Sequence, residues 1–378
     1  MYQYQRTNRY FAQIAGGLEE TGVLELTELD ATNITPGYRG LYFNADAETL
    51  YRINYCTRLI TRVLAPLLTF DCHSDKYLYQ TAQSVEWSDF LTPESTFAVF
   101  ATVSDSKINH SKFAALRLKD AIVDQFRDAT GKRPSIDTRN PDVWLNLRIR
   151  NDQAVISLDT SGGSLHRRGY RTASVEAPMQ ETVAAAAVRF SEWDGETPLY
   201  DPMCGSGTLL CEALMHHARI PAGYLRTTFG FERLPDFDAT IWQTEKAAAD
   251  NAIRSLADGL ITGSDIDPEA VSATRRNLSA LPGGDAVRTR QADFRKLEIK
   301  NATIICNPPY GMRLGRGGDM ADFYKFLGDF LKQRCTNSIA YIYFGKREWI
   351  KSLGLRASWK KPLVSGALDG RLVKVEVY

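Results

Sequence analysis

The second half of the chain alternates apolar, strand-like segments with helical segments, and this order restricts the fold more than any other feature. From about residue 170 the predicted elements are helix 179–190, strand 197–203, helix 207–218, strand 260–267, helix 268–281, strand 302–309, helix 320–334, strand 338–345 and strand 372–378. Strands that alternate with helices form mainly parallel sheets, which bind ligands at the carboxyl ends of their strands. We therefore expect a doubly wound, parallel α/β domain.

The first 160 residues mix strands and helices in a way that is typical of an α+β domain. The predicted elements are helices over 12–29, 47–67 and 111–134, strands over 38–46 and 95–104, and a hairpin over 142–162 that turns at Asn151-Asp152. Pro66 is expected to end the second helix. The expected buried stripe of the third helix consists of Phe113, Leu116, Ile122, Val123 and Phe126.

Length and composition indicate a globular protein of two or three domains, because 378 residues exceed one compact core. The sequence has no run of 18 apolar residues, and its first residues lack the apolar core of a signal peptide. Its six cysteines form no C-x-x-C pair and it has only five histidines, so no metal site is expected. Free thiols without an export signal suggest the cytoplasm.

Positive charge is concentrated in a few segments, although the net charge is only +1. Residues 331–378 contain ten Lys or Arg and three acids, and residues 103–133 contain seven Lys or Arg and four Asp. The segment 166–171, HRRGYR, adds three arginines. Such patches are typical of a surface that faces a polyanion, but solvated faces of ordinary helices would give the same pattern.

A glycine turn joins a strand to a helix in the segment LYDPMCGSGTLLCEA, residues 199–213. Gly205 and Gly207 permit a tight turn close to a ligand, and Thr208 can satisfy free N–H groups at the helix start. No lysine follows the glycines, so the segment is not a P-loop. Asp201 before the turn disfavours a phosphate and suits a cationic ammonium group. Met203 and Cys204 belong to the same candidate site, and a purely structural turn is the alternative.

Two further acids follow the next two strands. Asp265 ends the strand 260–267, where nucleotide-binding folds place an acid on a ribose, while Asp267 before Pro268 is expected to cap the next helix. Asp293 ends a short third strand and could accept a hydrogen bond from the adenine amino group, with Phe294 or Ile266 packed on the ring. A ligand with an ammonium group, a ribose and an adenine but no phosphate is S-adenosylmethionine. This half of the chain resembles the class I (Rossmann-like) S-adenosylmethionine-dependent methyltransferases.

The segment NPPY, residues 307–310, then falls at the end of the strand that faces the methyl donor. An exocyclic amine is a weak nucleophile and needs acceptors for its two hydrogens in a fixed geometry. The Asn307 side chain and the Pro308 carbonyl can be these acceptors, because Pro308 and Pro309 restrict the backbone. Tyr310 offers a ring on which a base can stack. The motif alone leaves adenine N6, guanine N2 and a glutamine amide open as targets.

The chain as a whole resembles the THUMP-domain guanine-N2 methyltransferases of 23S rRNA. The matching stretches are GGLEE, SKFAALRLKDAIVDQFRD, RPSIDTRNPDVWLNL, ISLDTSGGSLHRRGYR, APMQETVAAAAV, DPMCGSGTLLCEA, FGFE with IW (229–242), GSDID, NPPYG and LVSGALDGRL. The resemblance implies a ferredoxin-like region over 1–44, a THUMP RNA-binding domain over 45–160 and a class I methyltransferase domain over 161–378. Large bacterial members continue into a second methyltransferase that has no counterpart in these 378 residues.

The resemblance also suggests how RNA and the donor are held. Structured RNA is the implied partner, and a target guanine would have to flip out of its stack. Tyr170 could stack on RNA or simply pack in the protein. Gln180, Glu181 and Thr182 lie where related enzymes hold the methionine end of the donor, although helix capping would explain them equally. The candidate RNA contacts are Lys112, Arg117, Lys119, Arg167, Arg168 and Arg171.

The main hypothesis is therefore methylation of a guanine N2 in 23S rRNA, with a tRNA guanine as the nearest alternative. A DNA adenine methyltransferase would normally carry a different recognition domain. A glutamine methyltransferase typically has a shorter, helical amino-terminal domain. A non-enzymatic RNA-binding module is disfavoured because the acids, glycines and amide of the candidate site are all present.

Overall fold

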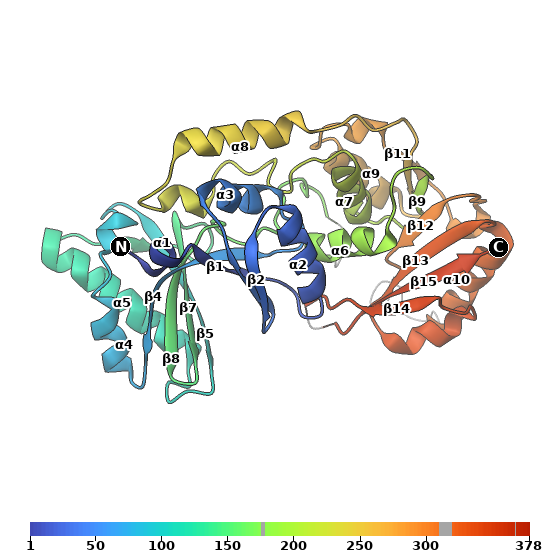
Figure 1. Cartoon of the computed structure of the whole chain (residues 1–378). Helices are drawn as coiled ribbons and strands as arrows, with labels where there is room; N and C mark the ends of the chain where they lie inside the picture. Colours follow the sequence, from blue (N-terminus) through green and yellow to red (C-terminus); the bar gives the residue numbers. More distant parts are fainter. Residues whose placement is uncertain (175–177, 310–319, 367) are drawn as a thin grey trace. The chain divides into compact units, whose positions relative to one another are not determined.

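The computed structural model describes residues 1–174, 178–309, 320–366 and 368–378. Within these residues the chain forms two compact units (Figure 1). The amino-terminal unit comprises Met1–Ile14, Glu19–Leu165 and Arg226–Ala247, and the carboxyl-terminal unit comprises Ala15–Leu18, His166–Leu225 and Ala248–Tyr378. None of the described helices is long and apolar enough to cross a membrane.

The amino-terminal unit contains one eight-stranded sheet with the order β2-β3-β1-β4-β8-β7-β5-β6. Its strands are β1 (Arg9–Gln13), β2 (Thr32–Gly37), β3 (Gly40–Asn44), β4 (Arg62–Asp71), β5 (Thr96–Ser104), β6 (Ser135–Ile136), β7 (Val143–Arg150) and β8 (Gln153–Asp159). The central strand β4 pairs antiparallel with both β1 and β8, so the first and last strands of this unit share a single sheet. The predicted hairpin of β7 and β8 is confirmed, and its turn residues Asn151 and Asp152 both have positive φ angles.

The helical elements of this unit are α1 (Gln3–Thr7), α2 (Glu19–Glu28), α3 (Ala47–Cys56), α4 (Asp75–Ala82), η1 (Trp87–Asp89) and α5 (Ser111–Thr130). Helix α5 ends at Gly131, which has a φ angle of 73°, as a left-handed cap requires. The predicted stripe of α5 is only partly correct, because Phe113 and Leu116 are 46% and 52% exposed. Small residues, Ala114 and Ala121, are buried instead, together with Leu118, Ile122, Val123 and Phe126.

Two helix predictions near the amino terminus extend too far. Helix α3 ends at Cys56, residues 57–61 are irregular, and residues 62–67 of the predicted helix belong to β4. Its β-branched residues suit a central strand, and Pro66 is tolerated because the ladder to β8 is irregular between Pro66 and Leu68. The prediction 12–29 likewise begins too early, since residues 12 and 13 pair in β1.

Residues 226–247, which lie between elements of the carboxyl-terminal unit in sequence, pack within the amino-terminal unit. They contain η2 (Gly230–Arg233) and the first part of α8 (Ala239–Asn251). Phe231 stacks on Tyr51 of α3 with ring centroids 4.5 Å apart, and Trp242 meets Tyr55 edge-on at 5.3 Å. These aromatic contacts hold residues 226–247, the inserted segment, against α3.

The carboxyl-terminal unit contains a seven-stranded sheet with the order β11-β10-β9-β12-β13-β15-β14. Its strands are β9 (Leu199–Asp201), β10 (Ile261–Asp265), β11 (Arg288–Gln291), β12 (Thr303–Cys306), β13 (Ser338–Phe344), β14 (Trp359–Pro362) and β15 (Arg371–Val377). The first five strands in this order are parallel, which confirms the predicted α/β class. At one edge the sheet is mixed, because β15 runs antiparallel to both β13 and β14.

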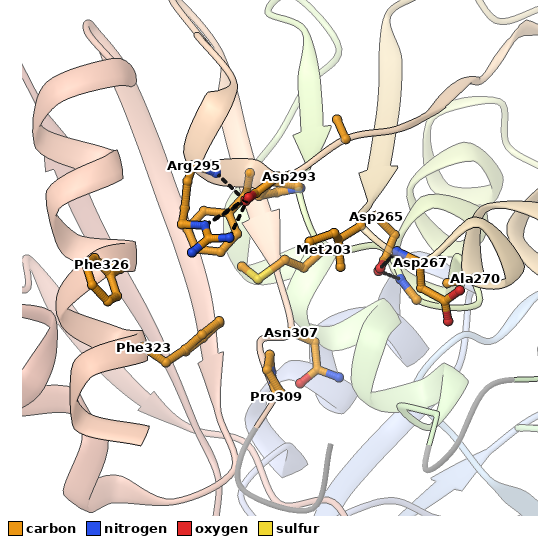
Figure 2. A pocket seen from close by; sticks show the side chains of 15 residues that line it. Met203, Asp265, Asp267, Ala270, Asp293, Arg295, Asn307, Pro309, Phe323 and Phe326 are labelled. Atoms are coloured by element: carbon orange, nitrogen blue, oxygen red, sulfur yellow. Dashed lines mark hydrogen bonds and ion pairs between the residues drawn. The ribbon is translucent and has the colours of Figure 1, made fainter. Parts of the chain in front are cut away.

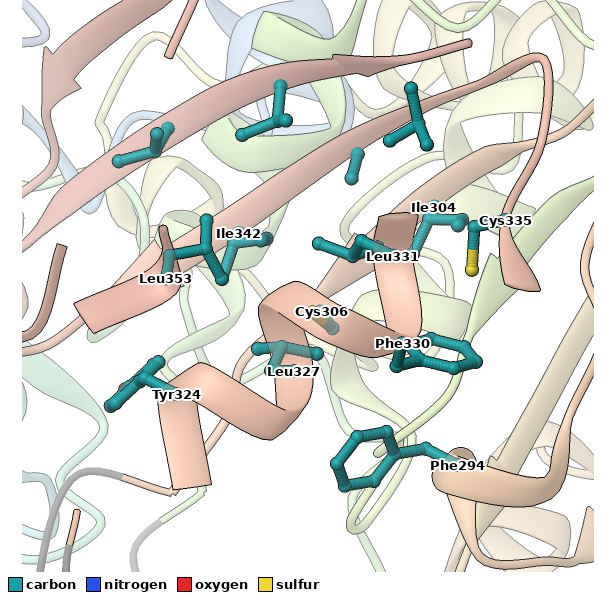
Figure 3. Packing of buried hydrophobic residues seen from close by; sticks show 14 of the residues in the cluster. Phe294, Ile304, Cys306, Tyr324, Leu327, Phe330, Leu331, Cys335, Ile342 and Leu353 are labelled. Carbon is teal, nitrogen blue, oxygen red and sulfur yellow. The ribbon is translucent and has the colours of Figure 1, made fainter. Parts of the chain in front are cut away.

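The helices of this unit are α6 (Glu181–Ser191), α7 (Thr208–His217), α9 (Pro268–Leu278) and α10 (Met320–Arg334), with short 3₁₀ segments η3 (Gly284–Ala286), η4 (Phe294–Lys296) and η5 (Arg347–Leu353). Helix α10 packs on the sheet through Tyr324, Leu327 and Leu331, which share one buried cluster with Ile304 and Ile342 (Figure 3). Burial of these side chains fixes the helix beside the carboxyl end of β12.

Candidate active site

A cavity of about 490 Å³ lies within the carboxyl-terminal unit at the ends of β9, β10 and β12. Figure 2 shows Phe323 and Phe326 on one side of it and Asp265 and Asp267 on the other. The lining residues are Pro202, Met203, Gly205, Asp265, Ile266, Asp267, Ala270, Ala292, Asp293, Phe294, Arg295, Asn307, Pro309, Phe323 and Phe326. The site thus lies where an open parallel sheet is expected to bind its ligand.

Asp265 fixes the glycine turn that begins after β9. Its Oδ2 accepts a hydrogen bond from the Gly205 backbone N–H at 2.9 Å, and its Oδ1 accepts one from the Asp267 N–H at 3.0 Å. Gly207 has a φ angle of 80°, and a Cβ atom there would lie 2.8 Å from Thr274 Cγ2. Asp267 caps α9 as predicted, because its side chain accepts the Glu269 N–H at 2.9 Å. Both acids line the cavity, and the assignment of the ribose to Asp265 stays a prediction.

Asp201 lies in a smaller adjoining pocket with Pro178, Met179, Cys204 and Thr208. Its side chain is 1% exposed, and its Oδ1 accepts the Met203 N–H at 3.1 Å. Burial raises the pKa of this carboxyl group well above its usual range. An ammonium group beside Asp201 would reverse this effect, because an opposite charge favours the ionised carboxylate.

We expect the affinity for S-adenosylhomocysteine to rise with pH over the range in which free Asp201 is still protonated. In the free protein burial favours the protonated form of Asp201, whereas the ammonium group of the ligand favours the ionised carboxylate. Ligand binding therefore releases a proton from Asp201. The affinity rises with pH as a result, by at most about tenfold per pH unit. Calorimetry in two buffers of different ionisation enthalpy measures the released proton. Asp201→Asn should bind more weakly and lose the pH dependence; an unchanged slope in this variant would contradict the assignment.

Arg171 binds residues that line this smaller pocket, so its guanidinium group is already engaged within the protein. Its Nη2 donates to the Met179 carbonyl at 2.7 Å and to Thr208 Oγ1 at 3.0 Å, and it lies 3.4 Å from Glu181 Oε1. The prediction that Arg171 binds RNA is therefore corrected, because its guanidinium group holds the segment before α6 to the start of α7. Linear sequence could not reveal this, since the partners lie 8 to 37 residues away.

Replacing Arg171 with methionine should weaken S-adenosylhomocysteine binding by about tenfold, because two charge-assisted hydrogen bonds that shape the pocket are lost. Arg167→Met is the matched control, since Arg167 belongs to the same segment but is exposed. Calorimetry without RNA measures both. Equal affinities for the two variants would show that Arg171 does not support the pocket.

The predicted methionine-end residues fall beside the pocket instead of in its wall. Gln180 is the exposed N-cap position of α6, and Thr182 is a buried residue within that helix. Neither lines the cavity or the smaller pocket, whereas the preceding Pro178 and Met179 do. Helix α6 begins at Glu181, so the residues that border the smaller pocket come before it, and the roles of Gln180 and Thr182 stay predictions.

Asp293 and Phe294 line the cavity as expected, but the Asp293 carboxylate already has a partner. Arg295 Nε lies 3.0 Å from both carboxylate oxygens, and its Nη2 donates to Oδ2 at 2.6 Å. The Arg295 backbone N–H donates to Oδ1 at 3.0 Å. These hydrogen bonds lower the pKa of Asp293. Ile266, 61% exposed, and Phe294 offer apolar surface in the same cavity.

Phe323 and Phe326 of α10 are cavity residues that sequence patterns did not reveal. Phe323 packs edge-on against Phe294 with ring centroids 5.8 Å apart, and Phe326 is 55% exposed. In the sequence they look like part of an amphipathic helix stripe. Phe323 and Phe326 are three residues apart in α10, so they lie on one face of that helix, beside the face that buries Tyr324. This spacing is the signal that could have identified them.

Asn307 presents an unpaired acceptor at the end of β12. Its Oδ1 atom is buried and has no hydrogen-bond partner among the described residues, and Asn307 borders both the cavity and the smaller pocket. The Tyr324 hydroxyl donates to the Pro309 carbonyl at 3.3 Å, which ties the proline turn to α10. Pro308 is buried and Pro309 lines the cavity. Tyr310 lies outside the described residues.

Arg168 must also be removed from the predicted RNA contacts. Its side chain is 1% exposed, and its Nε lies 3.4 Å from Oε1 of the buried Glu212, which also accepts the Tyr170 hydroxyl at 3.0 Å. Tyr170 therefore packs inside the protein. Removal of either partner would leave the other charge buried without compensation.

The other predicted RNA contacts lie at the surface to different degrees. Lys112 and Arg167 are exposed. Arg117 lies 3.5 Å from Asp75 and over the Tyr79 ring, and Lys119 pairs with Asp120, so both have local acidic partners. Among the described residues, no group of three or more His, Cys, Asp or Glu side chains is arranged to hold a metal ion.

Comparison with family models identifies the class of the carboxyl-terminal unit. The model for the RMKL-like methyltransferase domain matches residues 168–374. The chain belongs to this methyltransferase family. Models for the THUMP domain and the RlmL ferredoxin-like domain match residues 72–159 and 9–64. The predicted S-adenosylmethionine-dependent methyltransferase class and the ferredoxin-like and THUMP regions are thus confirmed, while the exact boundaries 1–44, 45–160 and 161–378 stay predictions.

Individual relatives of this methyltransferase cover nearly its whole length. A Synechocystis protein with the provisional name RNA methyltransferase is 39% identical over 98% of this chain and 97% of its own. The ribosomal RNA large subunit methyltransferase K/L of Syntrophotalea carbinolica is 38% identical over 98% of this chain and 53% of its own. The chain therefore spans about half the length of the K/L enzymes.

Solved structures with the same fold include two close matches. One is described as a methyltransferase complexed with SAH and has a TM-score of 0.84 and 26% identity, with 98% of each chain covered. The other, from Listeria monocytogenes, is described as a predicted N6-adenine-specific DNA methylase and has a TM-score of 0.83 and 25% identity, with 98% of this chain and 96% of that chain covered.

Proposed function

We propose that this protein is an S-adenosylmethionine-dependent RNA methyltransferase that acts on rRNA, and that it methylates the N2 amino group of a guanine in 23S rRNA. The observation that carries the proposal is the buried Oδ1 of Asn307, which borders both pockets and has no hydrogen-bond partner within residues 1–174, 178–309, 320–366 and 368–378. A buried acceptor without a partner is costly, and an amino group is the partner that its chemistry suits. The K/L relatives and the THUMP domain support rRNA as the substrate.

The acids and aromatic residues of the cavity suit the donor. Asp201 would hold the ammonium group and Asp265 the ribose, while Ile266 and Phe294 would flank the adenine. When bound there, S-adenosylmethionine supplies an activated methyl group. The smaller pocket and the cavity share Met203, Gly205 and Asn307, so a donor that extends through both would bring its methyl group close to Asn307.

Asn307 and the proline turn would orient the target amine. Asn307 Oδ1 accepts one N–H of the amine and the Pro308 carbonyl accepts the other, so that the nitrogen lone pair points at the methyl carbon. The N–C bond forms as the C–S bond breaks, the bonding electrons remain on sulfur, and the amine loses a proton afterwards. The guanine must leave its base stack to reach this position. A cytoplasmic location is consistent with such a substrate.

Methylation in vitro followed by nucleoside mass spectrometry tests the proposal. Unmodified 23S rRNA, bulk tRNA and double-stranded DNA are each incubated with labelled S-adenosylmethionine. N2-methylguanosine in 23S rRNA alone is expected. If N2-methylguanosine appears only in tRNA, the substrate is tRNA and not 23S rRNA. If N6-methyladenine appears in DNA, the result favours the activity for which the Listeria protein is named.

A further inference from the structure

Arg295 binds the carboxylate of Asp293, the residue that the sequence predicts to bind the amino group of the donor's adenine. The Asp293 carboxylate receives four contacts from Arg295, two at each oxygen, from the backbone N–H, Nε and Nη2. Three N–H donors make these contacts, since the one Nε hydrogen is shared between both oxygens, and they occupy most of the roughly four lone-pair positions of the carboxylate. An adenine amino group that binds Asp293 therefore competes with the Arg295 guanidinium group for these positions.

The pair can separate at little cost. The Arg295 side chain is 56% exposed, whereas that of Asp293 is 14% exposed. Arg295 is the exposed partner, so water can replace its lost contacts and its long side chain regains freedom when it moves away. Asp293 is fixed by its capping contact to the Arg295 N–H, so the mobile partner is the guanidinium group and not the carboxylate.

A released Arg295 would carry the positive charge that the cavity otherwise lacks. Among the described residues that line the cavity, Asp265, Asp267 and Asp293 are acidic and Arg295 is the one cation. A flipped nucleotide brings its flanking phosphates to the rim of such a cavity, and arginine is well suited to bind phosphate. While Arg295 is held by Asp293, its charge is largely neutralised locally.

We propose that Arg295 and the donor's adenine compete for Asp293, so that donor binding releases the Arg295 guanidinium group to contact a phosphate of the substrate RNA. The inference rests on the proposed function, and it assigns to Arg295 a role in RNA binding that depends on the donor. It predicts that donor and RNA strengthen each other's binding, because linkage between two sites is reciprocal.

Calorimetry with S-adenosylhomocysteine tests the competition. Arg295→Met removes the guanidinium group and should bind the ligand about two- to fivefold more tightly than the unaltered protein, the range expected when an exposed ion pair no longer competes. Arg288→Met is the matched control: Arg288 pairs with Asp258 at the surface and lies outside the donor cavity. It should leave the affinity unchanged. S-inosylhomocysteine, which lacks the 6-amino group, should show no gain with Arg295→Met.

Filter binding of an unmodified 23S rRNA transcript, with and without S-adenosylhomocysteine, tests the second step at fixed salt. The unaltered protein and Arg288→Met should bind the transcript several-fold more tightly with the ligand, and Arg295→Met should lose this difference. The inference is overturned if Arg295→Met binds S-adenosylhomocysteine as tightly as the unaltered protein or more weakly. It is also overturned if S-adenosylhomocysteine still strengthens transcript binding by Arg295→Met as much as it does for the unaltered protein. If the unaltered protein bound no S-adenosylhomocysteine at all, the proposed function itself would fail.

Discussion

Asn307→Ala is expected to lower kcat for RNA methylation by about 100- to 1,000-fold while S-adenosylhomocysteine still binds. The side-chain Oδ1 is buried at the end of β12 and has no hydrogen-bond partner in the part of the chain that the structure describes, so its removal deletes an acceptor for the target amine without breaking a described hydrogen bond of that atom. Losses of this size follow when one orienting polar group is removed from an active site. Measurement of kcat, KM for RNA and ligand affinity separates the chemical step from binding.

Asn307→Asp is the conservative counterpart, because a carboxylate keeps an acceptor at the same position. It should retain far more activity than the alanine variant. If the alanine variant kept activity within tenfold of the unaltered protein, Asn307 would not be an acceptor for the amine. A parallel loss of donor affinity would instead show that Asn307 supports the pocket.

Gly230→Ala is expected to destabilise the amino-terminal unit by about 2–4 kcal/mol. A Cβ atom at Gly230 would lie 1.9 Å from the Asp159 carbonyl oxygen and 2.7 Å from the Gly162 backbone nitrogen. Both are backbone atoms, so no side-chain rotation can make room and the segment 226–247 must shift away from the sheet. The substitution therefore tests whether this inserted segment is an integral part of the unit.

Chemical denaturation measures this effect, with Gly131→Ala as the control. Gly131 lies in the same unit and would meet nothing within 4 Å, but it has a positive φ angle, so alanine there should cost only about 1–2 kcal/mol. Gly230 has no positive φ angle, so its requirement for glycine is purely steric. A smaller loss for Gly230→Ala than for Gly131→Ala would contradict the close packing of the insertion.

Several site residues were predictable because their positions are local properties of the chain. Asp201 and Asp265 are the last residues of β9 and β10, Asn307 follows β12, and the carboxyl ends of parallel strands meet at one edge. The glycine turn and the cap at Asp267 likewise involve neighbours only a few residues apart. For these residues strand order and spacing were enough to predict a common site.

Other residues could not be assigned from sequence, because their roles depend on partners far along the chain. Arg168 and Arg171 look like an exposed basic motif, but Glu212, Met179 and Thr208 bind them inside the carboxyl-terminal unit. The boundary between α3 and β4 was missed for the same reason, since pairing with β1 and β8 overrides the helical spacing.

The sequence by itself determined the α/β class, the order of strands and helices, and the acids and amide that follow the strands, because periodicity and turn chemistry act over short distances. Only the tertiary structure decided that Arg168 is buried, that Phe323 and Phe326 line the cavity at the ends of β9, β10 and β12, and that residues 226–247 pack with the amino-terminal unit. A side chain's charge and size are local, but whether it meets solvent, an acid or a cavity depends on which distant segments the fold brings beside it.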